Sequence, residues 1–339
     1  MARMTIGRRQ FTCLLGSAIL TAPRAVGQPR QLPLIGFLHA ATAESRASDA
    51  PGFAQGLEEQ GFVEAQNLAV DYRFANGQRD QLAMLAADLV RRPVTLIVAG
   101  GAAAARAARA ATATIPIVAV SGFDLARLGL AASLDRPGGN VTGVTFTTAG
   151  LMNKRLGFLR ELVPGTTTIG YLAEDSRAYV SGAAILRAIE ERQSEMRTAA
   201  EAHGWQIIVA EVASDRDYEA AFTKLAERRV EALVVAPSAV FASDADDIVA
   251  LSLRYEIPTM FERRADVVAA GLISYGASRP DAWRQADIYV GQILKGAKPA
   301  DMPVLQSVRL ELVINETIAK SLGLTIPPSL LAQADEVVR

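Results

Sequence analysis

Histidine and cysteine, which supply many catalytic bases, nucleophiles and metal ligands, are scarce in this chain of 339 residues. The sequence holds two histidines, His39 and His203, and one cysteine, Cys13, which lies in a segment that we expect to be removed. It has no Gly-x-Ser-x-Gly turn of the kind that holds a nucleophilic serine. Cysteine nucleophiles, disulfides and thiolate metal sites are therefore excluded from the processed protein, and no cofactor is indicated.

The two histidines occupy different positions in the predicted elements. His203 ends a predicted helix, where water or the last carbonyl groups can satisfy it, so a structural role is favoured. His39 ends the first predicted strand, where a ligand contact and a structural hydrogen bond are both open. Thr42 follows shortly after and joins His39 as a candidate ligand-binding residue.

A glycine pair, Gly100-Gly101, ends one buried strand and opens an alanine-rich helix. Such a turn exposes backbone N–H groups that can bind a carboxylate or a phosphate. It lacks the Gly-x-Gly-x-x-Gly spacing of a dinucleotide site, and a tight strand-to-helix turn needs glycines for its own geometry. An anion-binding and a purely structural interpretation both remain open.

Polar and aromatic residues also follow the other predicted strands. Asp124, just after Ser121, either caps a short helix or pairs with a ligand ammonium group. An isolated acidic residue is more often a solvated loop charge, whereas an aromatic at a strand end packs or stacks on a ligand. Because open parallel sheets bind ligands at the carboxyl ends of their strands, we expect these residues to face one ligand. In the second half of the chain they are Glu174, Asp175, Ser238, Phe241, Glu262 and Tyr275.

Short β-branched runs alternate with amphipathic stretches from Leu32 onward, a pattern typical of α/β folds with parallel sheets. Leu82, Leu85 and Leu89, for example, mark the apolar face of one helix. The predicted strands are 34–38, 68–72, 95–99, 117–120 and 141–146, followed by 168–172, 206–212, 232–236, 259–261 and 272–275.

The two series of strands resemble each other at a nearly constant offset. Gly36-Phe37-Leu38 matches Gly170-Tyr171-Leu172, which lies 134 residues later, and Ile115-Pro116 matches Ile257-Pro258, which lies 142 residues later. Several such matches in the same order predict two copies of one βαβαβαβ unit, that is, two similar Rossmann-like lobes with parallel sheets. Two facing lobes create a cleft for a small molecule.

The first 27 residues read as a signal peptide. Arg3, Arg8 and Arg9 precede an apolar run over 11–22, and small residues at 25–27 give a cleavage site. The Arg8-Arg9 pair is compatible with twin-arginine export and equally with the general secretory route. The apolar run is too short to cross a bilayer, so we expect a periplasmic protein cleaved near Gly27.

Charge gives no sign of a nucleic-acid partner, because acidic residues (36) and basic residues (35) nearly cancel and no basic block occurs. Cleavage after Gly27 would remove four arginines and no acidic residue, which leaves a net charge of about −5. We therefore expect a mildly acidic protein. The internal repeat, which predicts two lobes around a cleft, leads us to expect a monomer.

Seven motifs are spread in order over the whole processed chain. They are LIGFL at 34–38, AADLV at 86–90, RPGGNVTGV at 136–144, SYG at 274–276, ILKGAKPAD at 293–301, ELVIN at 311–315 and LGLTIPPS at 322–329. Together they resemble the ABC transporter substrate-binding protein family, whose fold is the type I periplasmic binding protein fold. The resemblance implies a solute-binding protein that traps a small molecule between two lobes and passes it to a membrane permease, with some relatives similar to aromatic amino-acid binders.

The resemblance also implies three crossings between lobes, near 146, 276 and 304, which together form a hinge. The first lobe would comprise 32–146 and 277–303, and the second 147–276 and 304–339. The helix from Asp281 to Leu294 would then belong to the first lobe.

The sequence departs from the amino-acid-binding relatives at positions that would select the ligand. Those relatives tend to carry Asn-Pro where this chain has Ala173-Glu174, and Asp-Asn where it has Ser238-Ala239. They also tend to carry Asp-Pro-Val where this chain has Asp-Leu-Ala at 124–126. The resemblance therefore supports the geometry of the site but not an amino acid as the ligand.

Passive binding is the leading hypothesis. An exported enzyme that uses carboxylates such as Asp124, Glu174 and Glu262, and a sensor subunit without transport, are the alternatives.

Overall fold

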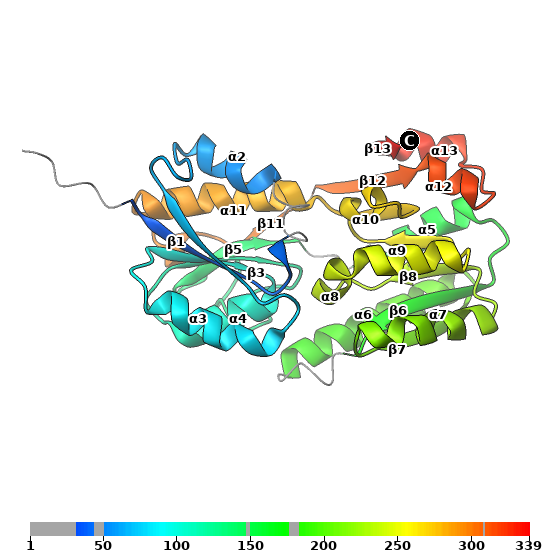
Figure 1. The fold of residues 1–339 in the computed structure, drawn as a ribbon, viewed down its shortest axis with the longest axis horizontal. Coiled ribbons are helices and arrows are strands. Elements are labelled where there is room, and N and C mark those ends of the chain that lie inside the picture. Colours follow the sequence, from blue (N-terminus) through cyan, green and yellow to red (C-terminus); the bar gives the residue numbers. More distant parts are fainter. Residues whose placement is uncertain (1–31, 44–50, 147–149, 176–182, 308) are drawn as a thin grey trace, which may run out of the picture. The chain divides into compact units, whose positions relative to one another are not determined.

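The computed structural model describes residues 32–43, 51–146, 150–175, 183–307 and 309–339, and the predicted signal peptide lies outside them. Residues Leu32–Arg339 form one compact unit. Within it the strands form two separate sheets, each flanked by helices (Figure 1). The two-lobe α/β organisation predicted from the alternation of strands and helices is confirmed.

The first sheet has six strands, all parallel, in the order β11-β5-β4-β3-β1-β2. Its strands are β1 (Leu34–His39), β2 (Ala69–Phe74), β3 (Leu96–Gly100), β4 (Ile117–Ser121), β5 (Val141–Thr145) and β11 (Leu305–Gln306). Its helices are α2 (Pro51–Glu59), α3 (Leu82–Val90), α4 (Ala102–Ala111) and α11 (Arg279–Leu294), with 3-10 turns at Arg79–Gln81 and Pro299–Asp301.

The second sheet has seven strands in the order β13-β12-β10-β9-β8-β6-β7, and only the β10–β12 pair is antiparallel. Its strands are β6 (Thr168–Glu174), β7 (Gln206–Val212), β8 (Ala232–Val235), β9 (Thr259–Phe261), β10 (Ile273–Ala277), β12 (Leu310–Asn315) and β13 (Glu336–Val338). The elements around it are α5 (Met152–Leu162), α6 (Ala183–Ala202), the 3-10 turn Asp215–Asp217, α7 (Tyr218–Glu227), α8 (Ala239–Ser243), α9 (Ala245–Arg254), α10 (Arg264–Val268), α12 (Glu316–Ser321) and α13 (Pro328–Gln333).

The internal repeat is visible in the strand order, because β2-β1-β3-β4-β5 of one sheet corresponds to β7-β6-β8-β9-β10 of the other. It is also visible in packing. A Cβ on Gly36 would lie 3.1 Å from Leu89 of α3, and a Cβ on Gly170 would lie 3.0 Å from Leu225 of α7. In each copy the missing side chain lets the helix after the second strand approach the first strand closely.

Both faces of the first sheet are buried, which explains its near-continuous apolar strands. Along β1, Ile35 and Phe37 face a cluster that contains residues of α11, whereas Leu38 faces the cluster built on α3 and α4. Burying a side chain of this size stabilises the fold by roughly 1.5–3 kcal/mol. The strands are thereby fixed in place, and with them the loops at their carboxyl ends.

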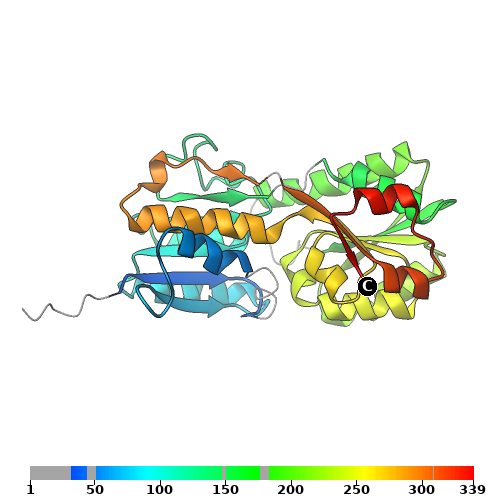
Figure 2. The ribbon, with the colours of Figure 1, turned by 90° about the horizontal axis from the view of Figure 1, so that it is seen from above.

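The chain passes between the sheets at three places, and Figure 2 shows α11 alongside the first sheet and β12 in the second. Ala277 of β10 pairs with Leu310 of β12, and the Ser278 N–H donates to the Arg309 carbonyl at 2.9 Å. The third crossing was expected near 304. The structure places it later, because Leu305 and Gln306 pair with Val144 and Thr145 of the first sheet.

Candidate functional site

A cavity of about 360 Å³ lies at the carboxyl ends of strands from both sheets. Its volume is that of a site for a small organic molecule. The first sheet contributes the turns after β1, β3 and β4, and the second contributes those after β6, β8 and β9, with α4, α6 and α11 completing the wall. Six predicted ligand-binding residues line it: His39, Gly100, Gly101, Glu174, Ser238 and Glu262.

Several neighbours fix the position of the His39 ring. Its Nδ1 accepts a hydrogen bond from the Ala41 N–H at 3.0 Å, so the ring proton of the neutral imidazole is on Nε2. The ring stacks on Phe37 at a centroid distance of 6.1 Å. It also covers Gly100, where an added Cβ would lie 2.0 Å from the His39 Cδ2 atom. Gly100 therefore lacks a side chain because the His39 ring fills that space.

Gly101 begins the turn into α4 at φ 92°, a conformation that glycine adopts far more readily than other residues. This geometry supports the structural interpretation of the glycine pair. It does not exclude the anion-binding one, because Gly101, Ala102 and Ala103 at the start of α4 all line the cavity.

On the second sheet's side, Ser238 and Glu174 form a hydrogen-bonded pair. The Ser238 hydroxyl donates to Glu174 Oε2 at 2.6 Å and accepts from the N–H groups of Val240 and Phe241, so that it caps α8. The Glu174 carboxylate is thus held against the wall of the cavity.

The other predicted residues lie outside the lining of this cavity. Ser121 is fully buried and accepts from the Phe123 N–H at 3.0 Å, while Asp124 accepts from the Ala126 and Arg127 N–H groups, the capping role weighed from the sequence. Thr42 and Asp175 are partly exposed and are likewise absent from the wall.

The two predicted aromatic contacts, Phe241 and Tyr275, pack inside the second lobe. Phe241 is 4% exposed and lies against Tyr218 at 6.1 Å between ring centroids. Tyr275 meets Phe158 of α5 edge to face at 5.0 Å. The aromatic side chains that line the cavity are Phe123, Phe146, Tyr171 and Trp283.

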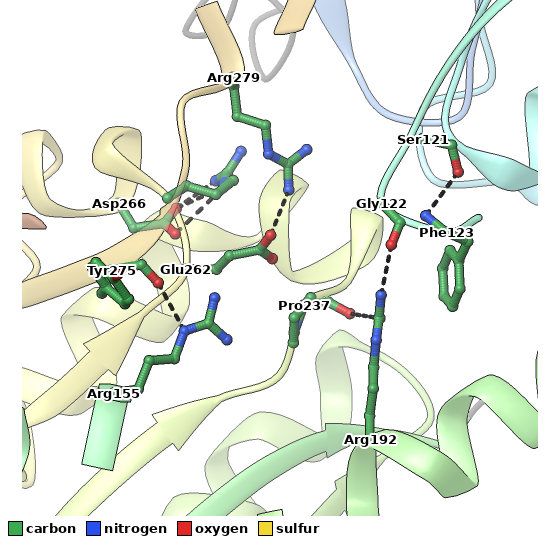
Figure 3. Close-up of polar contacts among 11 residues, drawn as sticks. Ser121, Gly122, Phe123, Arg155, Arg192, Pro237, Glu262, Asp266, Tyr275 and Arg279 are labelled. Atoms are coloured by element: carbon green, nitrogen blue, oxygen red, sulfur yellow. Dashed lines mark hydrogen bonds and ion pairs between the residues drawn. The ribbon is translucent and has the colours of Figure 1, made fainter. Parts of the chain in front are cut away.

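Four arginines line the cavity, and sequence reasoning missed all of them: Arg106, Arg192, Arg263 and Arg279. Arg279 lies 4.1 Å over the Phe146 ring, and Arg192 lies 4.1 Å over the Phe123 ring. Arg192 also donates to the Gly122 carbonyl at 3.0 Å, so a residue of α6 contacts the loop after β4 (Figure 3). A guanidinium stacked on an aromatic ring is held in place while its edge remains available to acceptors.

Some signals for these residues exist in the sequence. Arg279 lies two residues after the end of β10, and Arg106 lies one turn into the helix after Gly100-Gly101. Phe123 lies between Ser121 and Asp124, both of which were candidates. Arg192 carries no such signal, because α6 is rich in charged residues and only tertiary packing decides which of them faces the cavity.

Glu262 is the electrostatic centre of the site. It is 7% exposed, and Arg279 Nη2 donates to its Oε1 at 3.3 Å. Burial alone would raise the pKa of its carboxyl, but four surrounding guanidinium groups hold that pKa below its usual value. In order of decreasing influence they belong to Arg279, Arg155, Arg192 and Arg263.

Arg155 lies behind the cavity wall and is 1% exposed. Its Nε donates to the Tyr275 carbonyl at 2.7 Å, whereas its Nη2 finds no hydrogen-bond partner among the described residues. Burial lowers the pKa of this guanidinium, and the nearby Glu262 carboxylate opposes that effect. In Figure 3 the Glu262 carboxylate lies between the guanidinium groups of Arg155 and Arg279.

Within the part of the chain that the structure describes, no three His, Cys, Asp or Glu side chains cluster as a metal site would require. None of the described helices combines the length and the apolar character of a membrane span.

Comparison with known proteins agrees with this geometry. A family model described as ABC transporter substrate binding protein matches residues 35–338. A tyrosine-binding protein of Clostridioides difficile is 23% identical over 273 residues, which are 80% of this chain and 76% of that protein. A conserved domain protein from Vibrio cholerae has a TM-score of 0.80 at 24% identity, over 91% of this chain and all of that one (100%).

A second solved structure, an ABC domain from Streptococcus pneumonia in complex with L-Trp, has a TM-score of 0.80 at 27% identity, over 91% of this chain and 100% of that one. The two-lobe α/β architecture is that of the periplasmic binding proteins. The chain belongs to the family of ABC transporter substrate-binding proteins, and its function is to bind a small solute.

Proposed function

We propose that this protein is an exported, non-catalytic receptor that encloses a small aromatic solute in the cavity and presents it to the permease of an ABC importer. The observation that carries the proposal is the composition of the cavity wall, which joins strand-end turns of both sheets. A ligand that contacts both walls favours the arrangement in which they are close together.

The aromatic side chains of the wall support an aromatic solute. Phe123, Phe146 and Trp283 provide flat apolar surfaces, and a cavity of about 360 Å³ is large enough for a molecule with one ring system. The similarity to proteins whose names include tyrosine binding and an L-Trp complex supports the same class.

Passive binding is favoured over catalysis by the state of the polar groups. His39 uses Nδ1 on a backbone N–H, Glu174 accepts from a serine that caps a helix, and Glu262 is held by arginines. Each of these side chains is engaged in building the wall. A general base, by contrast, must reach a proton of the substrate.

The proposal includes direct ligand contacts from His39, Gly100, Gly101, Glu174, Ser238 and Glu262. It also includes export by the signal peptide over residues 1–27, action as a monomer, and a hinge of three crossings.

Mass spectrometry of the ligand that remains bound through purification, followed by calorimetry with that compound, tests the proposal. We expect one ligand per chain, recovered chemically unchanged after incubation. Conversion of the compound would establish the enzyme alternative. Retention of the precursor form inside cells, seen as an N-terminus at Met1, would contradict export.

A further inference from the structure

We infer that the solute is an organic anion without an ammonium group, an aromatic carboxylate rather than an amino acid, and that Arg279 binds its carboxylate. The inference rests on the proposed function, since it names the chemical class of that solute. It comes from the inventory of charges around Glu262.

The arginine cluster, defined here as Arg155, Arg192, Arg263 and Arg279, contains more charge than its neighbours neutralise. Arg263 pairs with the buried Asp266, donating from Nε to Oδ1 at 3.1 Å. Among the described residues, the carboxylates of Glu262 and Glu195 act on Arg155 and Arg192. Counted over these described side chains, four guanidinium groups face three carboxylates, which leaves one positive charge in excess.

The remaining charged side chains among the described residues of the cavity wall do not change this balance. They are Arg106 and Glu174, one of each sign. A ligand with a single negative charge therefore neutralises the site, whereas a zwitterionic amino acid leaves the excess in place. A buried charge without a counter-charge is costly, so the anion is the better ligand on electrostatic grounds.

The hydrogen-bonding geometry of Arg279 leads to the same conclusion. Its contact with Glu262 is 3.3 Å, longer than the 2.7–2.9 Å typical of charge-assisted bonds, and its Nε has no partner among the described residues. A guanidinium has five N–H donors, and stacking on Phe146 fixes its plane at the wall. Arg279 is thus positioned to receive a second carboxylate.

An α-ammonium group finds poor acceptors in the same cavity. Glu262 is surrounded by the four guanidinium groups, which would repel a ligand cation. Glu174 is the other carboxylate among the described residues of the lining, and it already accepts the short hydrogen bond from Ser238. If an amino acid were the ligand, Glu174 would have to bind its ammonium group, which provides a direct test.

The experiment compares matched probes that share a carbon skeleton: 3-phenylpropanoate, L-phenylalanine and 3-phenylpropanamide, and the corresponding indole series with L-tryptophan. Calorimetry at neutral pH measures the dissociation constant of each. We expect each acid to bind at least about tenfold more tightly than its amino acid and its amide, with an affinity that falls as salt is added. Equal or tighter binding of the amino acid would overturn the inference while leaving solute binding intact. Failure of all six probes to bind at millimolar concentration would contradict the aromatic solute itself.

Variants assign the subsite. Arg279→Gln should weaken binding of the acids about tenfold or more and change binding of the amides less than twofold, and Arg279→Lys should restore part of the loss. Arg109→Gln, at an exposed position of α4, is the matched control and should leave every affinity within twofold. A larger loss for L-phenylalanine than for 3-phenylpropanoate in Glu174→Gln would show that Glu174 binds an ammonium group, and would overturn the inference. An equal loss for acids and amides in Arg279→Gln would mean that Arg279 only supports the wall.

Discussion

Arg192 Nη2 donates to the Gly122 carbonyl oxygen at 3.0 Å, and this bond connects α6, beside the second sheet, with the loop that follows β4 of the first. The guanidinium also stacks on Phe123 at 4.1 Å. Such a contact stabilises the arrangement in which the two walls of the cavity are close, whether or not a ligand is present.

We expect Arg192→Leu to reduce the fraction of protein in which these walls are close. Ligand affinity should fall about five- to thirtyfold, because binding must then supply the lost contact free energy of roughly 1–2 kcal/mol. The chain has one cysteine, within the predicted signal, so paired cysteines introduced on the two lobes of the processed form can carry distance probes. Arg127→Gln is the control. It removes an exposed 3.0 Å ion pair with Glu191 and should change affinity less than twofold.

Ligand binding should be visible in tryptophan fluorescence. The chain has two tryptophans. Trp283 lines the cavity, whereas Trp205 is 7% exposed and stacks on His203. Trp205→Phe should therefore keep the full change of emission on titration with a bound solute, and Trp283→Phe should abolish it. A response carried by Trp205 would place the ligand elsewhere.

Gly143 in β5 is expected to be irreplaceable. Its φ is 148°, and a Cβ there would lie 1.9 Å from the Ala119 carbonyl oxygen of the neighbouring strand. Gly143→Ala must distort the sheet and should lower the free energy of unfolding by about 3 kcal/mol or more. Gly157→Ala, on α5 with open space around its Cβ position, should be neutral or stabilising by up to about 1 kcal/mol. Urea denaturation of both variants measures the change in the free energy of unfolding. Similar unfolding midpoints for the two variants would contradict the strain argument.

Part of the acid sensitivity should come from Glu231. Its carboxylate accepts from the Thr167 and Thr168 N–H groups at 2.6 and 2.9 Å, which holds its pKa below the usual value. A lowered folded-state pKa means that the stabilisation is complete above pH 4.5 and disappears as pH falls through the lowered value. Glu231→Gln should therefore melt about 1–3 °C below the parent at pH 7, and the two melting temperatures should converge in acid, once the pH has fallen through the lowered pKa. A constant difference at both pH values would show that the charge is not responsible.

Ten of the strands could be placed from the sequence within one or two residues, because buried β-branched runs bounded by Gly and Pro show where each strand begins and ends. Three strands were not predicted: the short strand β11, and β12 and β13 near the C-terminus. Their positions depend on contacts with β5 and β10, which lie far away along the chain.

Residues of the candidate site could be predicted from the sequence only where the position of a residue in its strand determines where its side chain lies. Residues such as Gly100 and Glu174 are the last of their strands and lie at the cavity for that reason. Tyr275 shows the limit, since it lies within β10, where successive side chains alternate between faces, and it faces α5. The sequence shows that the helices α6 and α11 contain arginines. It does not show which face of each helix is turned toward the cavity, because tertiary packing determines that.

The pairing of β10 with β12 carries a mechanical consequence. Two of the three connections between the lobes start at β10 and β12, which pair as one antiparallel ribbon. The last pair of this ribbon is Ala277–Leu310, and beyond it the Ser278 N–H donates to the Arg309 carbonyl. A ribbon bends easily across its flat face but resists shear, because sliding one strand along the other breaks every hydrogen bond between them. We therefore expect motion of one lobe against the other to be a rotation about an axis lying across these two strands rather than a translation.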